Sequence, residues 1–138
     1  MLLGTVICPT EIRPVRVLLA DDQAPTREGL RTLLSLSPQV VMVGEAANGM
    51  QTLDLVADKH PDVVLMDVHM PVMDGLTACA EIKCRWPDIR VIALTMDASR
   101  REAAIDAGAD KFLVKGGASE ELWNSILASP RVVRQPKG

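Results

Sequence analysis

Five short apolar runs alternate with five segments of helical periodicity along this chain, and no other feature constrains its fold as strongly. Apolar runs of roughly four to eight residues are typical of strands buried in a parallel sheet. Their alternation with helical segments is the pattern of βαβ units, so the sequence predicts a parallel α/β fold. The predicted strands are 15–20, 40–43, 62–66, 89–94 and 111–114, and the predicted helices are 25–36, 48–59, 76–86, 98–107 and 119–128.

Length and composition indicate one globular domain. The chain has 138 residues, of which 48% are hydrophobic and 24% charged, and this length suits one domain of ordinary size. The predicted domain covers 15–128, with an N-terminal extension at 1–14 and a tail, or the start of a linker, at 129–138. The formal net charge of −3 gives the chain no basic surface for binding nucleic acid.

The sequence shows no sign of secretion or of a membrane span. Its apolar start lacks the basic region of a signal peptide, and no run of about 18 apolar residues occurs. Cys8, Cys79 and Cys84 form no C-x-x-C pair, and the chain has two histidines, which argues against a zinc site or a disulfide framework. We therefore expect a cytoplasmic protein in which Cys79 and Cys84 pack against the core from a helix.

Several residues are expected to end helices or to face the core. Asp74 is placed to cap the helix that follows it, and Gly108 is placed to end the next helix. In the second predicted helix, the spacing of Met50, Leu53 and Ala57 predicts that these three side chains face inward. The second predicted strand is expected to stop where glycine follows it.

Polar side chains follow four of the five apolar runs, at the point where each predicted strand ends. These residues are Asp21, Asp22, Asp67, Thr95 and Lys115. In an open parallel sheet, the carboxyl ends of the strands form the crevice where ligands bind. Three acids, a hydroxyl and an ammonium at this edge predict a site for a divalent metal and a phosphoryl group.

The chemistry of these groups supports that prediction. A carboxylate such as Asp67 can act as a nucleophile and form an acyl phosphate. Three neighbouring carboxylates repel one another, and a hard cation relieves the repulsion, so all-oxygen ligands favour Mg²⁺ or Mn²⁺ over zinc. Lys115 supplies a positive charge for phosphate, and the Thr95 hydroxyl supplies a hydrogen bond.

Together with the segment Met70-Pro71-x-Met73-Asp74-Gly75, these five residues resemble the signature of a bacterial two-component response-regulator receiver domain, over about 15–128. The segment Val43–Gly49 further resembles transcription regulators of the NarL/FixJ (LuxR) type. The resemblance implies a single doubly wound, flavodoxin-like (βα)5 domain. Its five-stranded parallel sheet would have the order 2-1-3-4-5.

The resemblance also implies a role for each residue. Asp67 would be the phosphoacceptor, and Mg²⁺ (or Mn²⁺) would bind Asp22, the Asp67 carboxylate and the backbone carbonyl of His69. Asp21 would act on the metal mainly through water. Lys115 would contact the phosphoryl oxygens.

The same resemblance implies how phosphorylation would be read out. Thr95 would contact the phosphoryl oxygens together with the lysine, and Phe112 would fill the aromatic switch position. The chain differs from many receivers at two places: Gly116 follows the lysine where proline is common, and the switch residue is phenylalanine rather than tyrosine.

The function implied is a switch, not an enzyme that turns over a substrate. A sensor histidine kinase would phosphorylate the domain, which would change a protein-interaction surface and could form a homodimer. Control of transcription would need a DNA-binding output domain beyond this chain. The alternatives are a stand-alone receiver that acts by protein contact, a pseudo-receiver that binds partners constitutively, and an aspartyl-phosphate phosphotransferase or phosphatase. The last of these expects D-x-D-x-[TV] near the chain start, whereas His69 lies two residues after Asp67.

Overall fold

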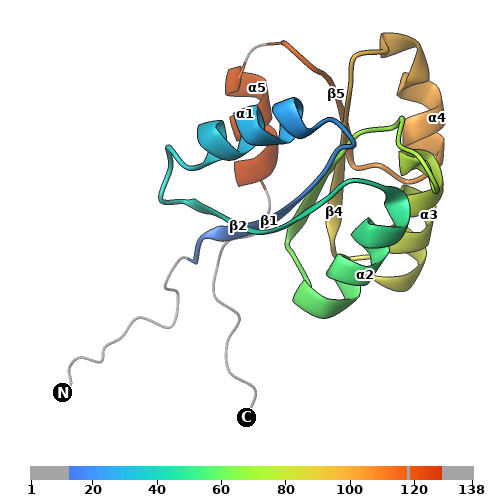
Figure 1. The fold of residues 1–138 in the computed structure, drawn as a ribbon, viewed down its shortest axis with the longest axis horizontal. Coiled ribbons are helices and arrows are strands. Elements are labelled where there is room, and N and C mark those ends of the chain that lie inside the picture. The colour runs from blue at the N-terminus through green and yellow to red at the C-terminus, as the bar shows by residue number, and fades with distance from the viewer. Residues whose placement is uncertain (1–12, 118, 129–138) are drawn as a thin grey trace.

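A computed structural model of the chain describes residues 13–117 and 119–128, and its sheet has the expected strand order. Five parallel strands lie in the order β2-β1-β3-β4-β5, with helices on both sides (Figure 1). The strands are β1 (Val15–Ala20), β2 (Val40–Ala46), β3 (Val63–Met66), β4 (Arg90–Thr95) and β5 (Lys111–Val114). The doubly wound, flavodoxin-like fold is therefore confirmed.

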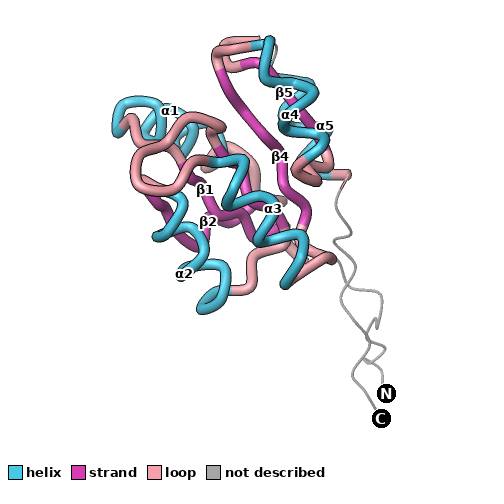
Figure 2. The backbone as a smooth tube through the Cα atoms, turned by 90° about the vertical axis from the view of Figure 1, so that its right-hand side faces the viewer, coloured by secondary structure: helices cyan, strands magenta, loops and turns pink. Residues whose placement is uncertain are grey.

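The helices form two layers, one on each face of the sheet (Figure 1, Figure 2). The helices of the first layer are α1 (Ala24–Leu34) and α5 (Ser119–Leu127). The helices of the second layer are α2 (Gly49–Lys59), α3 (Gly75–Arg85) and α4 (Arg101–Asp106), and α4 follows a 3₁₀ turn, η1 (Ala98–Arg100). The predicted helix at 98–107 is therefore two short pieces.

Buried side chains form one hydrophobic cluster on each face, because successive side chains of a strand point to opposite sides of the sheet. The α1/α5 face consists of Val15, Val17, Leu19, Leu34, Val40, Val63, Leu65, Ile92, Leu94, Leu113, Leu122 and Ile126. The α2/α3/α4 face consists of Leu18, Ala20, Ala46, Val56, Val64, Met66, Val68, Met70, Ala78, Cys79, Ile82, Ile89, Val91, Ala93, Ala104, Ala109 and Phe112. Strands between these clusters are buried on both sides.

Helix ends follow the sequence closely. The Asp74 carboxylate accepts a hydrogen bond from the Thr77 amide at 2.8 Å, which confirms the predicted cap of α3. Asn48 caps α2 in the same way, with its side-chain oxygen 2.8 Å from the Gln51 amide. Gly108 follows α4 with φ +103°, a conformation that glycine adopts without steric strain. Capping side chains thus fix where α2 and α3 begin, and a glycine with positive φ fixes where α4 ends.

Strand β2 is longer than predicted, because it continues beyond Gly44. The pairing of β1 with β2 shifts by one residue between Val17 and Leu18, which makes Val43 the extra residue of a β-bulge. Glu45 therefore belongs to the strand, at the edge of the sheet that α1 covers.

Helix α2 is rotated relative to the prediction. Met50 and Ala57 are exposed, so their predicted inward orientation is wrong, whereas Leu53 packs against the core. Thr52 and Val56 are the side chains buried beneath the helix. The amide of the first helical residue donates a hydrogen bond of 2.9 Å to a carbonyl in the loop before α3, so the start of the helix lies against that loop.

The remaining predictions have mixed outcomes. Cys79 is buried as expected, but Cys84 is exposed on α3, so the prediction that it packs in the core is wrong. The predicted extension at 1–14 falls outside the described residues except for its last two, and the predicted tail at 129–138 falls outside them entirely. Within 13–117 and 119–128, we find no helix with the length and apolar character that a bilayer span requires.

Candidate functional site

Loops at the carboxyl edge of the sheet enclose a pocket of about 440 Å³. The strand ends are level there, since Ala20 pairs with Met66 and Met66 pairs with Ala93 in the parallel register. The residues lining the pocket are Asp22, Gln23, Thr26, Asp67, His69, Thr95, Met96, Asp97 and Lys115. Of the residues predicted for the site, only Asp21 and Phe112 are not part of this lining.

The three predicted acids form one cluster. Asp21, Asp22 and Asp67 each offer a carboxylate oxygen, and these oxygens all lie within 4.8 Å of one another. Asp21 and Asp67 are buried, whereas Asp22 is exposed to the pocket. Anionic oxygens are the ligands preferred by hard divalent cations, so this donor set fits Mg²⁺ or Mn²⁺.

Lys115 neutralises part of this negative charge. Its Nζ lies 2.5 Å from Asp21 Oδ2 and 3.0 Å from Asp67 Oδ2, so one ammonium bridges both buried carboxylates. Burial of the side chain acts to lower the pKa of Lys115, but hydrogen bonds and charge attraction from the two aspartates outweigh it and raise the pKa above its ordinary value. The lysine therefore stays charged at neutral pH, within reach of any group that binds at Asp67.

Asp67 is held by the strand and by the loop that follows it. Its amide donates to the Ala20 carbonyl at 2.9 Å, and its Oδ1 accepts a hydrogen bond from the His69 amide at 3.2 Å. The start of α3 comes very close: a Cβ at Gly75 would lie 2.0 Å from the Asp67 carbonyl oxygen. Glycine is therefore required at 75, and this close approach limits the movement of the Asp67 backbone.

The loop after β4 forms the opposite wall of the pocket. Thr95 is buried, and its hydroxyl oxygen accepts a hydrogen bond from the Asp97 amide at 3.3 Å. Hydrogen bonds from Ser99 hold the pKa of the exposed Asp97 carboxyl below its usual value. The His69 ring extends from the other side, with Nε2 3.8 Å from Asp97 Oδ2. Thr95 thus lies at the base of the pocket, and His69 and Asp97 lie at its mouth.

Phe112 lies apart from the pocket, in the core of the α2/α3/α4 face. The ring is buried, and the Arg101 guanidinium lies over it, 5.8 Å from the ring centroid. Its strand partner is Ala93 in β4, two residues before Thr95. The structure therefore places the predicted switch residue in β5, beside the strand that ends at Thr95 and outside the lining of the acidic pocket.

Gly116 explains how the chain dispenses with the proline common at this position. Its φ is +82°, a conformation that the proline ring forbids and that L-residues with side chains rarely adopt.

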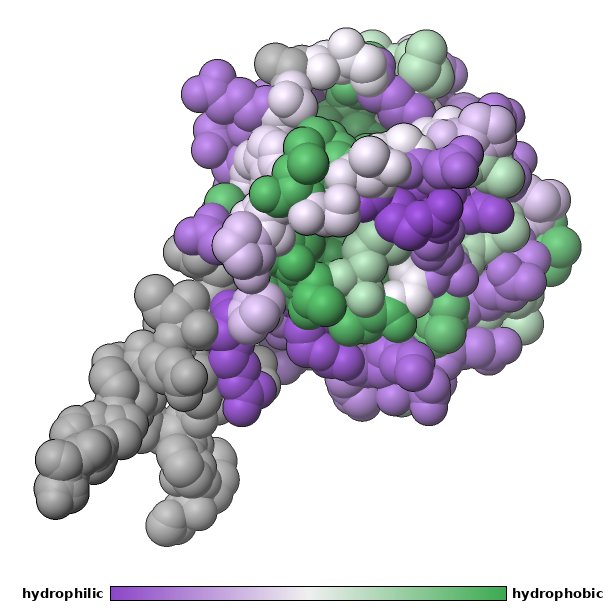
Figure 3. Space-filling model, turned by 60° about the vertical axis from the view of Figure 1, so that its left-hand side comes forward, coloured by the Kyte–Doolittle hydropathy of each residue, from purple (hydrophilic) through white to green (hydrophobic). Residues whose placement is uncertain are grey.

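Gly116 also borders an apolar groove of about 390 Å³ between α1 and α5. Figure 3 shows hydrophobic side chains gathered in the hollow of this side of the molecule. The groove is lined by Thr26, Leu30, Leu33, Leu94, Met96, Leu113, Val114, Lys115, Gly116, Gly117, Ser119, Glu121 and Leu122.

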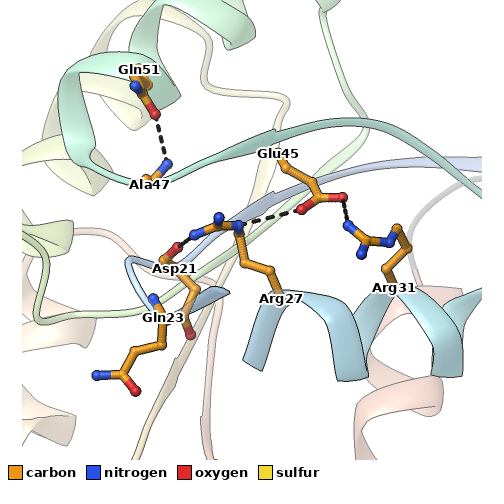
Figure 4. Close-up of polar contacts among 7 residues, drawn as sticks. All are labelled: Asp21, Gln23, Arg27, Arg31, Glu45, Ala47 and Gln51. Carbon is orange, nitrogen blue, oxygen red and sulfur yellow. Dashed lines mark hydrogen bonds and ion pairs between the residues drawn. The ribbon is translucent and has the colours of Figure 1, made fainter. Parts of the chain in front are cut away.

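One polar contact at the site was missed in the sequence. Arg27 on α1 donates a hydrogen bond from Nη1 to the backbone carbonyl of Asp21 (Figure 4). The signal available was indirect: Arg27 and Arg31 lie four residues apart, on one side of a helix, and Glu45 belongs to the Val43–Gly49 segment. Nothing in the spacing alone connects these residues to the acidic pair.

Comparison with known proteins agrees with the geometry. The family model described as "Response regulator receiver domain" matches residues 17–127. Among curated proteins, "Response regulator MprA" from Mycobacterium sp. (strain KMS) is 42% identical over 127 residues, which cover 91% of this chain and 54% of MprA. This chain therefore spans about half the length of that relative.

Solved structures with similar folds carry the same kind of description. The signal receiver domain of the response regulator NarL from Mycobacterium tuberculosis matches with a TM-score of 0.79 and 35% identity, over 84% of this chain and 95% of that one. A two-component response regulator of the LuxR family from Aurantimonas sp. SI85-9A1 matches with a TM-score of 0.79 and 31% identity, over 83% of this chain and 84% of that one.

Proposed function

Because this chain belongs to the family of response regulator receiver domains, we propose that Asp67 accepts a phosphoryl group from a sensor histidine kinase in a Mg²⁺-dependent reaction. One observation carries the proposal: the buried Asp67 carboxylate lies 3.0 Å from the Lys115 ammonium and within 4.8 Å of two further acidic oxygens. Phosphoryl transfer to a carboxylate needs this combination, with cationic charge arranged around an anionic acceptor.

The metal ligands follow from the acidic cluster. The Asp22 carboxylate, the Asp67 carboxylate and the His69 backbone carbonyl would hold Mg²⁺ (or Mn²⁺), with Asp21 acting mainly through water. The bound cation would neutralise negative charge on the transferring phosphoryl oxygens. Asp22 is the exposed member of the cluster, so a cation can reach it from the pocket.

The chain's own residues account for the remaining steps. A carboxylate oxygen of Asp67 forms the bond to phosphorus while the bond from phosphorus to the donor histidine nitrogen breaks, and the electron pair of that bond stays on the nitrogen. Lys115 then pairs its ammonium with a phosphoryl oxygen, and the Thr95 hydroxyl donates a hydrogen bond to another. Both residues already line the pocket beside the acceptor.

The response would leave the site through Thr95 and Phe112. When the Thr95 hydroxyl turns toward the phosphoryl group, the Phe112 ring moves into the space behind it and the surface of α4, β5 and α5 changes. The chain's net charge of −3 supports an output by protein contact, with DNA bound through a separate output domain. The domain would thus act in the cytoplasm as a switch that catalyses only its own phosphorylation and dephosphorylation, and it could pair as a homodimer.

Acetyl phosphate tests this proposal without the kinase. The wild-type chain should gain the mass of one phosphoryl group in Mg²⁺ and none in EDTA, as read by intact-protein mass spectrometry. Asp67→Asn should abolish the gain, whereas Asp54→Asn, an exposed carboxylate on α2, should not alter it. Phosphorylation of Asp67→Asn at the wild-type rate, or equal labelling of the wild type in EDTA, would refute the proposal.

A further inference from the structure

We propose that Arg27 is a positioning residue for the metal-binding acids, and that Glu45 holds it in place. The inference rests on the proposed function, because it concerns how the acidic cluster is prepared for a cation. It assigns a purpose to Glu45 within the Val43–Gly49 segment, which the phosphoacceptor chemistry leaves unexplained.

The contacts of Arg27 join three elements of the fold. Its Nη1 donates to the backbone carbonyl of Asp21 at 2.5 Å, and its Nε donates to Glu45 Oε1 at 3.3 Å (Figure 4). The arginine comes from α1, the aspartate follows β1, and the glutamate lies in β2. A guanidinium is planar and presents its donors in a fixed fork, so one rigid group sets the distance between the end of β1 and the edge strand.

The bond from Arg27 completes the fixing of Asp21. The Asp21 amide donates to the Ala46 carbonyl at 2.9 Å, and Oδ1 accepts from the Gln23 amide at 2.9 Å. Oδ2 pairs with the Lys115 ammonium, and Arg27 takes the remaining group, the backbone carbonyl. That carbonyl belongs to the peptide unit that leads into Asp22. Because a peptide unit is planar, fixing its oxygen fixes the direction in which the chain enters Asp22.

Asp22 is the acid that gains most from this support. It is exposed, whereas Asp21 and Asp67 are buried and share the lysine. Its place in the cluster therefore depends on the backbone that carries it rather than on packing around its side chain. Removal of a group that orients a metal ligand without touching the metal typically weakens metal binding by about 10- to 100-fold.

Glu45 keeps Arg27 in the orientation that this role needs. Its second oxygen pairs with Arg31, one helical turn further along α1 (Figure 4). The side chains of Arg27 and Glu45 are 21% and 28% exposed, whereas that of Arg31 is 48% exposed. Arg27 is thus the better shielded partner and the one that reaches the site, while Arg31 contacts the glutamate from the solvent side. Arg31 therefore offers a matched control on the same helix.

A positioning role and a charge effect predict opposite changes in Mg²⁺ affinity when Arg27 is replaced. A positive charge beside a cation site opposes metal binding, so if charge alone mattered, its removal would tighten Mg²⁺ binding. If the hydrogen bond positions the acids, loss of the guanidinium weakens binding whether or not the charge is kept. Arg27→Lys keeps the charge and loses the fork, and Arg27→Gln loses both.

The test is a Mg²⁺ titration of wild type, Arg27→Lys, Arg27→Gln and Arg31→Gln, followed by amide NMR, together with uptake of phosphate from acetyl phosphate. Both Arg27 variants should bind Mg²⁺ about 10-fold more weakly. Their maximal uptake rate at saturating Mg²⁺ should stay close to that of wild type. Arg31→Gln should change the affinity no more than a few-fold, as expected for an exposed ion pair.

Amide hydrogen exchange in EDTA gives a second measurement that needs no metal. The Gln23 amide, bonded to Asp21 Oδ1, should exchange faster in both Arg27 variants than in Arg31→Gln. Tighter binding by Arg27→Gln with unchanged binding by Arg27→Lys would overturn the inference in favour of a charge effect. Unchanged affinity and unchanged exchange in both Arg27 variants would also overturn it. Failure of the wild type to bind Mg²⁺ would instead remove the proposed function, and the exchange rates would still decide whether Arg27 orders the loop.

Discussion

The two faces of the sheet are packed with different kinds of side chain. The cluster on the α1/α5 face consists entirely of valine, leucine and isoleucine. The cluster on the α2/α3/α4 face contains six alanines, two methionines, a cysteine and the only phenylalanine of the chain. Branched aliphatic side chains have few rotamers and interlock closely, whereas methionine is flexible and alanine leaves room for neighbours to shift. The second face is therefore the more adaptable of the two.

The Asp67 site adjoins the α2/α3/α4 face. A small pocket of about 10 Å³ has Asp67 in its lining, together with Ala93, Ala104 and Ala109. A pocket of this size has room for about one water molecule, so the side chains around it are less closely packed than those of a filled core. We therefore expect a change at Asp67 to shift side chains there, next to α4, rather than among the branched residues of the α1/α5 face. If Asp67 is phosphorylated as proposed, the signal should travel through the α2/α3/α4 face.

The largest effect should come from truncating the more closely packed face. Leu65 and Met66 are neighbours in β3, both almost fully buried, and they point to opposite faces. Leu65→Ala should lower the free energy of unfolding by about 3–5 kcal/mol and Met66→Ala by about 2–3 kcal/mol, because the cost of a cavity depends on how far its surroundings collapse. Urea denaturation with unchanged m-values measures both.

The same two variants can also refute the claim that the two faces differ in rigidity. Equal losses in the two variants, or a larger loss for Met66→Ala, would mean that the α2/α3/α4 face is packed as rigidly as the other. The difference in alanine and methionine content would then have no mechanical meaning.

A smaller effect on stability, with a larger one on signalling, is expected at Phe112. Phe112→Leu should lower the free energy of unfolding by about 1–2 kcal/mol, through lost volume and the lost Arg101 contact over the ring. Phosphate uptake at Asp67 should persist, because Phe112 does not line the pocket. The phosphate-dependent amide NMR shifts at 97–117 should shrink.

The neighbouring residue supplies the control for that variant. Leu113 lies next in β5 and points into the α1/α5 face. Leu113→Val should destabilise the domain by about 1 kcal/mol, as a loss of one methylene does, yet keep the full phosphate-dependent shifts. If both variants respond like wild type, the signal leaves the site by another route; if both lose the response, stability rather than the identity of the face decides it.

Local sequence patterns specify where helices begin and end, whereas tertiary packing specifies which face of a helix is buried. Asp74 and Gly108 could be placed correctly because capping and a left-handed turn depend on one residue and its neighbours. Met50 and Ala57 were misplaced because α2 buries Thr52 and Val56 instead, and its first residue is bonded to the loop before α3. Periodicity gives the width of an apolar stripe, but tertiary packing selects the face.

The candidate site divides in the same way. Asp21, Asp22 and Asp67 could be grouped from sequence, since each follows an apolar run and the strand ends of a parallel sheet meet. Arg27 could not be grouped with them, because its part depends on a β-bulge that adds Glu45 to the edge strand opposite α1. Residues at strand ends are thus predictable, and those that support them from helices follow from packing.

The smallest expected effect concerns the reactivity of Cys79, a thiol on the α2/α3/α4 face. Burial, together with the nearby Asp110 charge, raises the pKa of Cys79 to about 11, whereas Cys84 on the same helix is exposed. Since the thiolate is the reactive form, a raised pKa leaves Cys79 protonated at pH 8 and its thiolate appears only as pH rises toward 11. Iodoacetamide should therefore modify Cys84 at least about 100-fold faster than Cys79 at pH 8, as peptide mass spectrometry would show.

Labelling of Cys79 in the two β3 variants then tests whether the α2/α3/α4 face opens independently of the α1/α5 face. Cys79 and Met66 belong to the same cluster, so Met66→Ala should loosen the surroundings of the thiol directly. It should accelerate Cys79 labelling more than Leu65→Ala does, although it lowers global stability less, because local opening of one face does not require the other to open. If labelling instead follows global stability, with Leu65→Ala the faster, then Cys79 reacts only from the unfolded chain. The two faces would in that case open as one unit, and their different composition would not give the α2/α3/α4 face any motion of its own.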